Sequence, residues 1–184
     1  MRRLLLAILL LATTAVTADE CRYGFTTGDK FGSGLVSSAV FADFNEDGLV
    51  DFIVSDGFFN NLYLNRGYGE YDKKQLAFNG DVLAAADVNG DGHMDVVLDP
   101  AIGAVSGDGK GNFGALIRSG NPTSPKAERL VDLNGDGLKD IVYKTYVSPA
   151  ALIVQFATGD GHFGPPTEIV APIRADSNYR IGDF

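Results

Sequence analysis

Three short stretches of the sequence carry oxygen-bearing side chains at one fixed spacing, D-x-N-x-D-G-x-x-D. They occupy 43–51, 87–95 and 132–140, so the repeat period is 44 and then 45 residues. Side chains at positions one, three and five of such a loop can turn toward one point, and glycine at position six permits a sharp bend. Carboxylate, amide and backbone carbonyl oxygens are the ligands that a hard cation such as Ca²⁺ prefers. The spacing therefore predicts about three Ca²⁺ sites.

The alternative is that these stretches are ordinary turns, because Asp, Asn and Gly are the commonest turn residues. All five signature positions, however, are kept in all three copies. Without an ion, the Asp carboxylates of each loop repel one another. A turn that required shape alone would not retain this charge, so the pattern favours metal binding.

The sequence around the loops indicates strands and excludes EF-hands. An EF-hand places its last carboxylate at position twelve between two helices, whereas here the last carboxylate is at position nine. Each loop is followed by a short β-branched or aromatic run, at 52–54, 96–98 and 141–143. Such runs are typical of buried strands, and the segments before the loops (39–41, 84–86 and 129–131) are too short for helices. The loops are therefore expected to join strands.

A second signature, close to G-D-G-x-F-G, recurs at 107–114 and 159–164, with weaker versions at 28–32 and 65–71. Glycine and aspartate supply the positive φ angles of a tight hairpin, and the following aromatic residue is expected to pack beneath the turn. In the first repeat the expected strands cover 37–43, 52–55, 61–65 and 71–78. Strand residues 167–170 are flanked by three prolines, which suits an outer edge. A repeat of about 45 residues with four antiparallel strands indicates an all-β protein made of β-propeller blades.

These loops and turns resemble the FG-GAP/VCBS repeat family, which forms the blades of the integrin α-subunit head and of many exported bacterial proteins. The resemblance covers about residues 25–184 and implies that each acidic loop joins the first two strands of a blade and holds a structural Ca²⁺. It implies backbone carbonyl ligands at position seven and side-chain ligands elsewhere. The implied ligands are Asp43, Asn45, Asp47, Leu49 and Asp51; Asp87, Asn89, Asp91, His93 and Asp95; and Asp132, Asn134, Asp136, Leu138 and Asp140. Glu46 departs from the glycine found at 90 and 135, and is expected either to strain the first loop or to add nearby charge.

Residues 1–18 have the form of a secretory signal peptide, with Arg2 and Arg3 first, an apolar stretch over 4–12, and small residues before the cleavage site. An uncleaved anchor is the alternative, although the apolar stretch is short for a bilayer. The mature segment would be 19–184, located outside the cell, at its surface or in the periplasm, with no membrane span. Cys21 is the one cysteine, so it is expected to be a free thiol or to pair with another chain.

The charge balance argues against nucleic acid as a partner, because the chain has a net charge of −9. Removal of the signal peptide takes away two arginines and no acidic residue, which makes the charge −11. Three divalent ions would neutralise more than half of it. The sequence contains no nucleophile elbow, phosphate-binding loop or transition-metal cluster. We therefore expect a protein that is not an enzyme.

The expected function is a secreted or surface Ca²⁺-binding scaffold for binding or adhesion. The alternatives are a non-catalytic structural repeat segment of a larger exported enzyme or adhesin, and a glycan-binding propeller formed by oligomerisation. For the last, Phe58, Phe59 and Tyr146 are candidate contacts, although packing between blades explains them as well. We expect about three blades with partial blades at both ends, an incomplete ring that belongs to a longer protein. If the chain ends at Phe184, closure of a ring would require a homo-oligomer.

Overall fold

A computed structural model describes residues 35–99, 103–119, 125–145 and 150–173, and for 125–128 and 170–173 it describes the backbone alone. The expected signal peptide, Cys21, Tyr146 and the partial blades at both ends lie outside the described residues. The described residues contain twelve strands and no helix. None of them therefore forms a helix long and apolar enough to cross a membrane.

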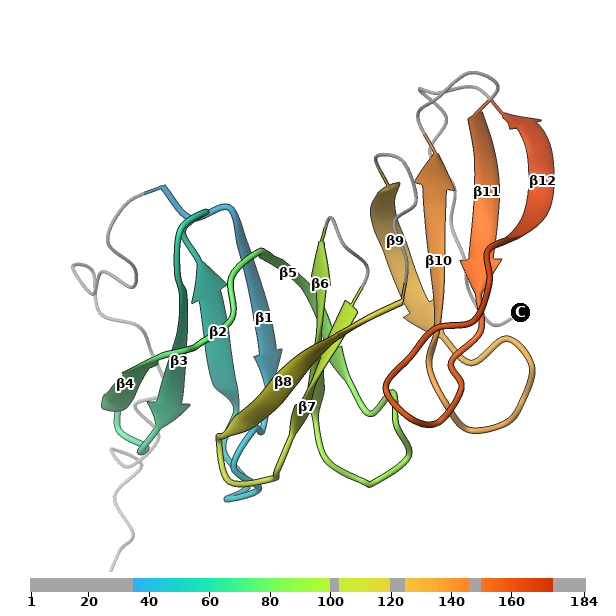
Figure 1. Cartoon of the computed structure of the whole chain (residues 1–184). Helices are drawn as coiled ribbons and strands as arrows, with labels where there is room; N and C mark the ends of the chain where they lie inside the picture. Colours follow the sequence, from blue (N-terminus) through green and yellow to red (C-terminus); the bar gives the residue numbers. More distant parts are fainter. Residues whose placement is uncertain (1–34, 100–102, 120–124, 146–149, 174–184) are drawn as a thin grey trace, which may run out of the picture.

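The twelve strands form three separate four-stranded antiparallel sheets, one for each predicted repeat (Figure 1). Blade 1 contains β1 (Ser38–Ala42), β2 (Asp51–Ser55), β3 (Asn60–Asn65) and β4 (Tyr71–Gln75). Blade 2 contains β5 (Asp81–Ala86), β6 (Asp95–Asp99), β7 (Gly103–Gly107) and β8 (Phe113–Arg118). Blade 3 contains β9 (Pro125–Val131), β10 (Asp140–Thr145), β11 (Ala150–Gln155) and β12 (Thr167–Ile173). In each sheet the strands lie in chain order, which confirms the predicted all-β architecture of propeller blades.

This meander places the two signatures of every repeat at one end of its sheet. The acidic loop joins the first strand to the second and the glycine turn joins the third to the fourth, so both emerge at the same end. The connection between the second and third strands emerges at the opposite end. In Figure 1 the acidic loops after β1 and β5 lie below their sheets.

The blades pack face to face because the second strand of each is apolar on both sides. Ile53 of β2 and Val96 of β6 belong to one cluster of buried side chains, between blades 1 and 2. Val97 of β6 and Ile141 of β10 belong to another, between blades 2 and 3. Since successive strand residues point to opposite faces, β6 contributes to the junctions on both sides of blade 2.

The first strands of blades 1 and 2 lie side by side and are joined by hydrogen bonds. Ser37 Oγ lies 2.5 Å from Asp81 Oδ1, and the Val82 N–H donates to Ser38 Oγ at 2.9 Å. Because β1 and β5 also pack against each other, the narrow side of the blade stack is formed by first strands, as in a propeller.

Two strand boundaries differ from the sequence prediction. The fourth strand of blade 1 ends at Gln75 rather than at residue 78, because Leu76 and Phe78 turn into the core between blades 1 and 2. The last strand extends from Thr167 to Ile173, so Pro172 lies inside it rather than beside it. Since β12 pairs with β11 alone among the described strands, proline is tolerated there, as expected at an edge.

Candidate functional site

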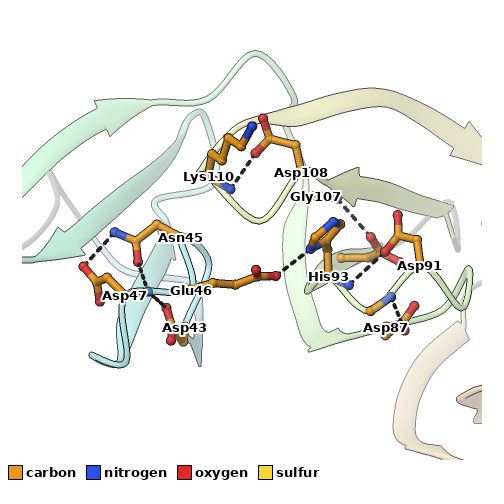
Figure 2. Close-up of polar contacts among 12 residues, drawn as sticks. Asp43, Asn45, Glu46, Asp47, Asp87, Asp91, His93, Gly107, Asp108 and Lys110 are labelled. Carbon is orange, nitrogen blue, oxygen red and sulfur yellow. Dashed lines mark hydrogen bonds and ion pairs between the residues drawn. The ribbon is translucent and has the colours of Figure 1, made fainter.

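The three acidic loops have nearly the same hydrogen-bonding pattern, and Figure 2 shows part of it for the first two loops. At position one, Asp43, Asp87 and Asp132 each accept a hydrogen bond from the N–H of the position-six glycine, at 2.8–2.9 Å. At position five, Asp47, Asp91 and Asp136 each accept one from the N–H of the position-seven residue, at 2.8–2.9 Å. The carboxylates therefore cap the turn of their own loop.

The position-three asparagine lies between these two carboxylates in every loop. In loop 2, Asn89 Oδ1 accepts the Asp91 N–H at 2.9 Å, and Asn89 Nδ2 donates to Asp91 Oδ2 at 2.9 Å. Asn45 and Asn134 make the same pair of contacts. Positions one, three and five thus gather acidic and amide oxygens at one partly exposed loop.

The position-nine aspartates are completely buried, and each joins its loop to the glycine-turn side of the blade. One oxygen of Asp51 accepts the N–H of Phe44 in the loop, at 3.0 Å. The other accepts the N–H of Asn65, at the end of β3, at 2.7 Å. Asp95 and Asp140 do the same between Val88 and Gly107 and between Leu133 and Ala157.

The pKa values reflect this burial and the nearby negative charge. Burial raises the pKa of Asp51 above its ordinary value against two backbone hydrogen bonds, and repulsion from Asp47 and Asp43 adds to the rise. The pKa of Asp95 is raised for the same reasons. In loop 3, partial desolvation acts to raise the pKa of Asp132, but N–H donation from Gly137 and Gly135 outweighs it, and the net shift is downward. The loops thus contain carboxylates close enough to repel one another.

The first loop differs from the other two where Glu46 replaces glycine. The N–H groups of Gly90 and Gly135 donate to the position-one carboxylate at 2.7 Å. In loop 1, Asp43 Oδ1 instead accepts the Asp47 N–H at 3.2 Å. Glu46 has a φ angle of 58°, a conformation that usually favours glycine. Its side chain leaves the loop and reaches His93 of loop 2 (Figure 2).

The glycine turns of blades 2 and 3 also form hydrogen bonds with the preceding blade. The Gly111 N–H donates to the Phe44 carbonyl oxygen at 2.9 Å, from blade 2 to loop 1. The Phe163 N–H donates to Ser119 Oγ at 2.7 Å, from blade 3 to blade 2. The expected packing beneath the turn is confirmed for Phe113 and Phe163, which lie in or against the buried clusters. The residues that donate these hydrogen bonds between blades lie in the second, glycine-rich signature of the sequence.

The donor set of each loop suits a hard cation, since it consists of carboxylates, one amide oxygen and backbone carbonyls. The assignment of these side chains as ligands stays a prediction. The predicted position-seven ligands are the backbone carbonyls of Leu49, His93 and Leu138. The N–H groups of the same residues donate to the position-five carboxylates. Among the described residues, no three His, Cys, Asp or Glu side chains converge as a metal-binding group.

Two aromatic side chains that the sequence suggested as glycan contacts are exposed at the opposite end of blade 1. Phe58 and Phe59 lie in the connection between β2 and β3, with exposed fractions of 78% and 48%. Asp56 Oδ1 accepts the N–H groups of both residues, at 3.1 and 2.8 Å. The turn that presents these rings is therefore fixed by its own aspartate.

Among solved structures, the fold is similar to that of a lectin from Agrocybe aegerita, studied for its specific recognition of non-reducing terminal N-acetylglucosamine. The TM-score is 0.55 at 24% sequence identity, and the match covers 71% of this chain and 37% of the lectin. The chain thus spans little more than a third of the lectin's length. The likeness concerns the fold.

Residues 43–98 match the family model of the FG-GAP-like repeat. This segment begins at the first acidic loop and ends in β6, after the second acidic loop. The third loop has the same residues at all five signature positions and the same hydrogen bonds. The predicted resemblance is therefore confirmed, and residues 43–98 are similar to an FG-GAP-like repeat.

Proposed function

We propose that this chain is an exported, Ca²⁺-stabilised propeller scaffold that presents a surface for binding, and that it carries out no catalytic step. The observation that supports the proposal is the threefold recurrence of one acidic loop with a fully buried aspartate at its base. Burial of a carboxylate beside two further carboxylates costs free energy unless a cation compensates the charge.

The proposed ligands in each loop are the side-chain oxygens at positions one, three, five and nine and the carbonyl at position seven. Bound Ca²⁺ would supply positive charge and cross-link the loop. Because position nine also holds the backbone beside the glycine turn, the ion would stabilise the blade as well as its loop. Its role would be structural.

The test is a thermal melt and a calorimetric titration with Ca²⁺ after treatment with a chelator. Extracellular Ca²⁺ sites have dissociation constants of roughly 0.1–1 mM. A site at the tight end stabilises the fold by about 1.4 kcal/mol at 1 mM Ca²⁺. Three such sites should raise Tm by on the order of 10 °C. Superimposable melts with chelator and with Ca²⁺, together with no binding heat, would show the ligand assignment to be wrong.

A pair of variants in blade 3 makes this test specific. Asp136→Ala should remove one of three binding equivalents and leave two, because Asp136 is exposed and its hydrogen bonds lie within its own loop. Asp160→Ala is the matched control, since Asp160 lies in the glycine turn of the same blade, outside the acidic loop. It should retain all three equivalents.

A second candidate function is glycan binding at the end of blade 1 opposite the acidic loops. It is favoured by the exposure of Phe58 and Phe59 on a turn fixed by Asp56. The similarity in fold to a lectin supports a search for it. A glycan array probed with the wild type and with a Phe58→Ala/Phe59→Ala variant tests it, and signals that are unchanged by the variant would exclude this site.

A further inference from the structure

A groove of about 600 Å³ lies between the outermost strands of blades 1 and 2. One wall is the end of β4 and the connection that follows it, over residues 74–79. The other wall is β8 with the residue before it, over 112–118. The volume is within the range of sites that bind small molecules, roughly 300–1,000 Å³.

The floor of the groove is apolar and fixed in place, because it is the outer part of the core between the two blades. Leu76, Phe78, Phe113 and Leu116 line the groove and also lie in or against that core. Phe78 and Phe113 meet edge to face, with ring centroids 5.6 Å apart. Above this floor, the walls carry the amide groups of Gln75, Asn79 and Asn112, which can both donate and accept hydrogen bonds.

The charge of the groove is opposite to that of the chain. Lys74 and Arg118 line it, and none of the described lining residues is acidic, although the whole chain has a net charge of −9. Lys74 Nζ donates to the Gly111 carbonyl at 3.2 Å and to Asn112 Oδ1 at 2.5 Å, which holds the two walls together. An ammonium group has three donors, so one remains for a ligand. Arg118 adds a planar guanidinium that can bind a carboxylate through two hydrogen bonds.

We propose that this groove binds an acidic saccharide, a sugar ring that carries a carboxylate. The carboxylate would contact Arg118 and Lys74, the hydroxyls would contact the amides, and the less polar face of the ring would lie on the Phe78 and Phe113 floor. A bare anion would make no use of the apolar floor, and a neutral sugar would leave both cations without a counter-charge. The inference rests on the proposed role as a binding scaffold, but it requires neither Ca²⁺ nor the Phe58 and Phe59 turn.

The experiment titrates the chain with hexuronate tetrasaccharides (galacturonate, glucuronate and mannuronate) and with their methyl esters, which keep the ring and remove the charge. Binding is measured by calorimetry in chelator as well as in Ca²⁺, so that failure of the Ca²⁺ proposal is recorded separately. We expect saturable binding of at least one acid, and binding about tenfold weaker for its ester. Affinity should fall as salt is added. The proposal is overturned if none of the acids binds or if acid and ester bind equally.

Three variants locate the site. Arg118→Gln should weaken binding about tenfold without loss of a hydrogen bond between described residues, and Lys74→Gln should weaken it similarly. Lys73→Gln is the matched control, because Lys73 is adjacent on β4 but lies over the Tyr63 ring, 5.7 Å from its centroid, on the other face. It should bind as the wild type does. Equal losses in Lys73→Gln and Arg118→Gln would show non-specific attraction, whereas loss in Phe58→Ala/Phe59→Ala with none in Arg118→Gln would place the site at the other end of the blade.

Discussion

Glu46 Oε1 lies 2.5 Å from His93 Nδ1, so position four of the first acidic loop is bonded to position seven of the second. The same two positions meet at the next junction, where a Cβ atom built on Gly90 would lie 3.2 Å from Leu138 Cδ2. The acidic loops of consecutive blades therefore face each other in the same way, with a polar contact at the first junction and an apolar side chain over glycine at the second.

The first prediction concerns the conformation of Glu46, whose φ angle of 58° lies in the left-handed region. Glu46→Gly removes the hydrogen bond to the exposed His93 side chain, which contributes little at the surface, but it also removes backbone strain of about 1 kcal/mol. Its free energy of unfolding should therefore be close to that of the wild type. Glu46→Ala loses the bond and keeps the strain, so it should be about 1 kcal/mol less stable than Glu46→Gly in urea unfolding. Equal stability of the two variants would contradict this account.

The second prediction separates the buried aspartates from the exposed ones. Asp51→Ala leaves the N–H groups of Phe44 and Asn65 without their acceptor, and each bond to a charged group contributes about 1.5–3 kcal/mol. We expect a loss of at least 3 kcal/mol in urea unfolding with chelator present. Asp47→Ala, at an exposed position of the same loop, should cost less than about 1 kcal/mol under the same conditions. If the two losses are alike without Ca²⁺, the buried aspartate does not join the loop to the glycine turn as described.

The blades could be predicted from sequence because their signals are local and repeated. The period of the acidic loops gave the number of blades, and the apolar runs after them gave the central strands. The double role of Asp51, Asp95 and Asp140 could not be predicted, because their second hydrogen-bond donors are 12–17 residues away and depend on strand register. The sequence reading assigned these aspartates to the ion alone.

The groove between blades 1 and 2 could not be predicted from the sequence either. Lys74 and Arg118 stand on outer strands of different blades, and neither belongs to a motif. Their side chains line one groove because the core between the blades sets the distance between β4 and β8. Phe58 and Phe59, by contrast, could be proposed as glycan contacts from the sequence, since two aromatic residues beside Asp and Gly indicate an exposed turn.

The third prediction concerns Gly107, where β7 meets its glycine turn. A Cβ atom on Gly107 would lie 2.2 Å from the Met94 carbonyl oxygen, so the acidic loop and the turn would have to separate. We expect Gly107→Ala to cost about 3 kcal/mol or more in urea unfolding. Ala157 holds the equivalent place in blade 3, since its N–H donates to Asp140 as that of Gly107 donates to Asp95.

The control for this substitution is Gly57→Ala. Gly57 has a φ angle of 83° and nothing within 4 Å of a built Cβ atom, so Ala there meets conformational strain without a clash. Its cost should be about 1 kcal/mol. A loss in Gly107→Ala no greater than that in Gly57→Ala would mean that the loop and turn can separate freely.

The last prediction concerns acid stability and the turn between β7 and β8. The Asn112 side chain and backbone N–H lower the pKa of Asp108 to about 2, from an ordinary value of 3.8. A carboxyl whose pKa is lower in the folded state stabilises the fold above its unfolded pKa, and this contribution is lost as the pH falls through about 2. Asp108→Asn should therefore reduce the loss of stability between about pH 4 and 2.

An NMR titration of the Asp108 carboxyl checks the cause of the lowered pKa. Asn112→Ala should raise the pKa of Asp108 toward the ordinary value. Lys110→Gln, which removes the weakest of the lowering contacts, should leave it near 2. A wild-type Asp108 that titrates near pH 4 would show that the contacts with Asn112 do not stabilise its charge.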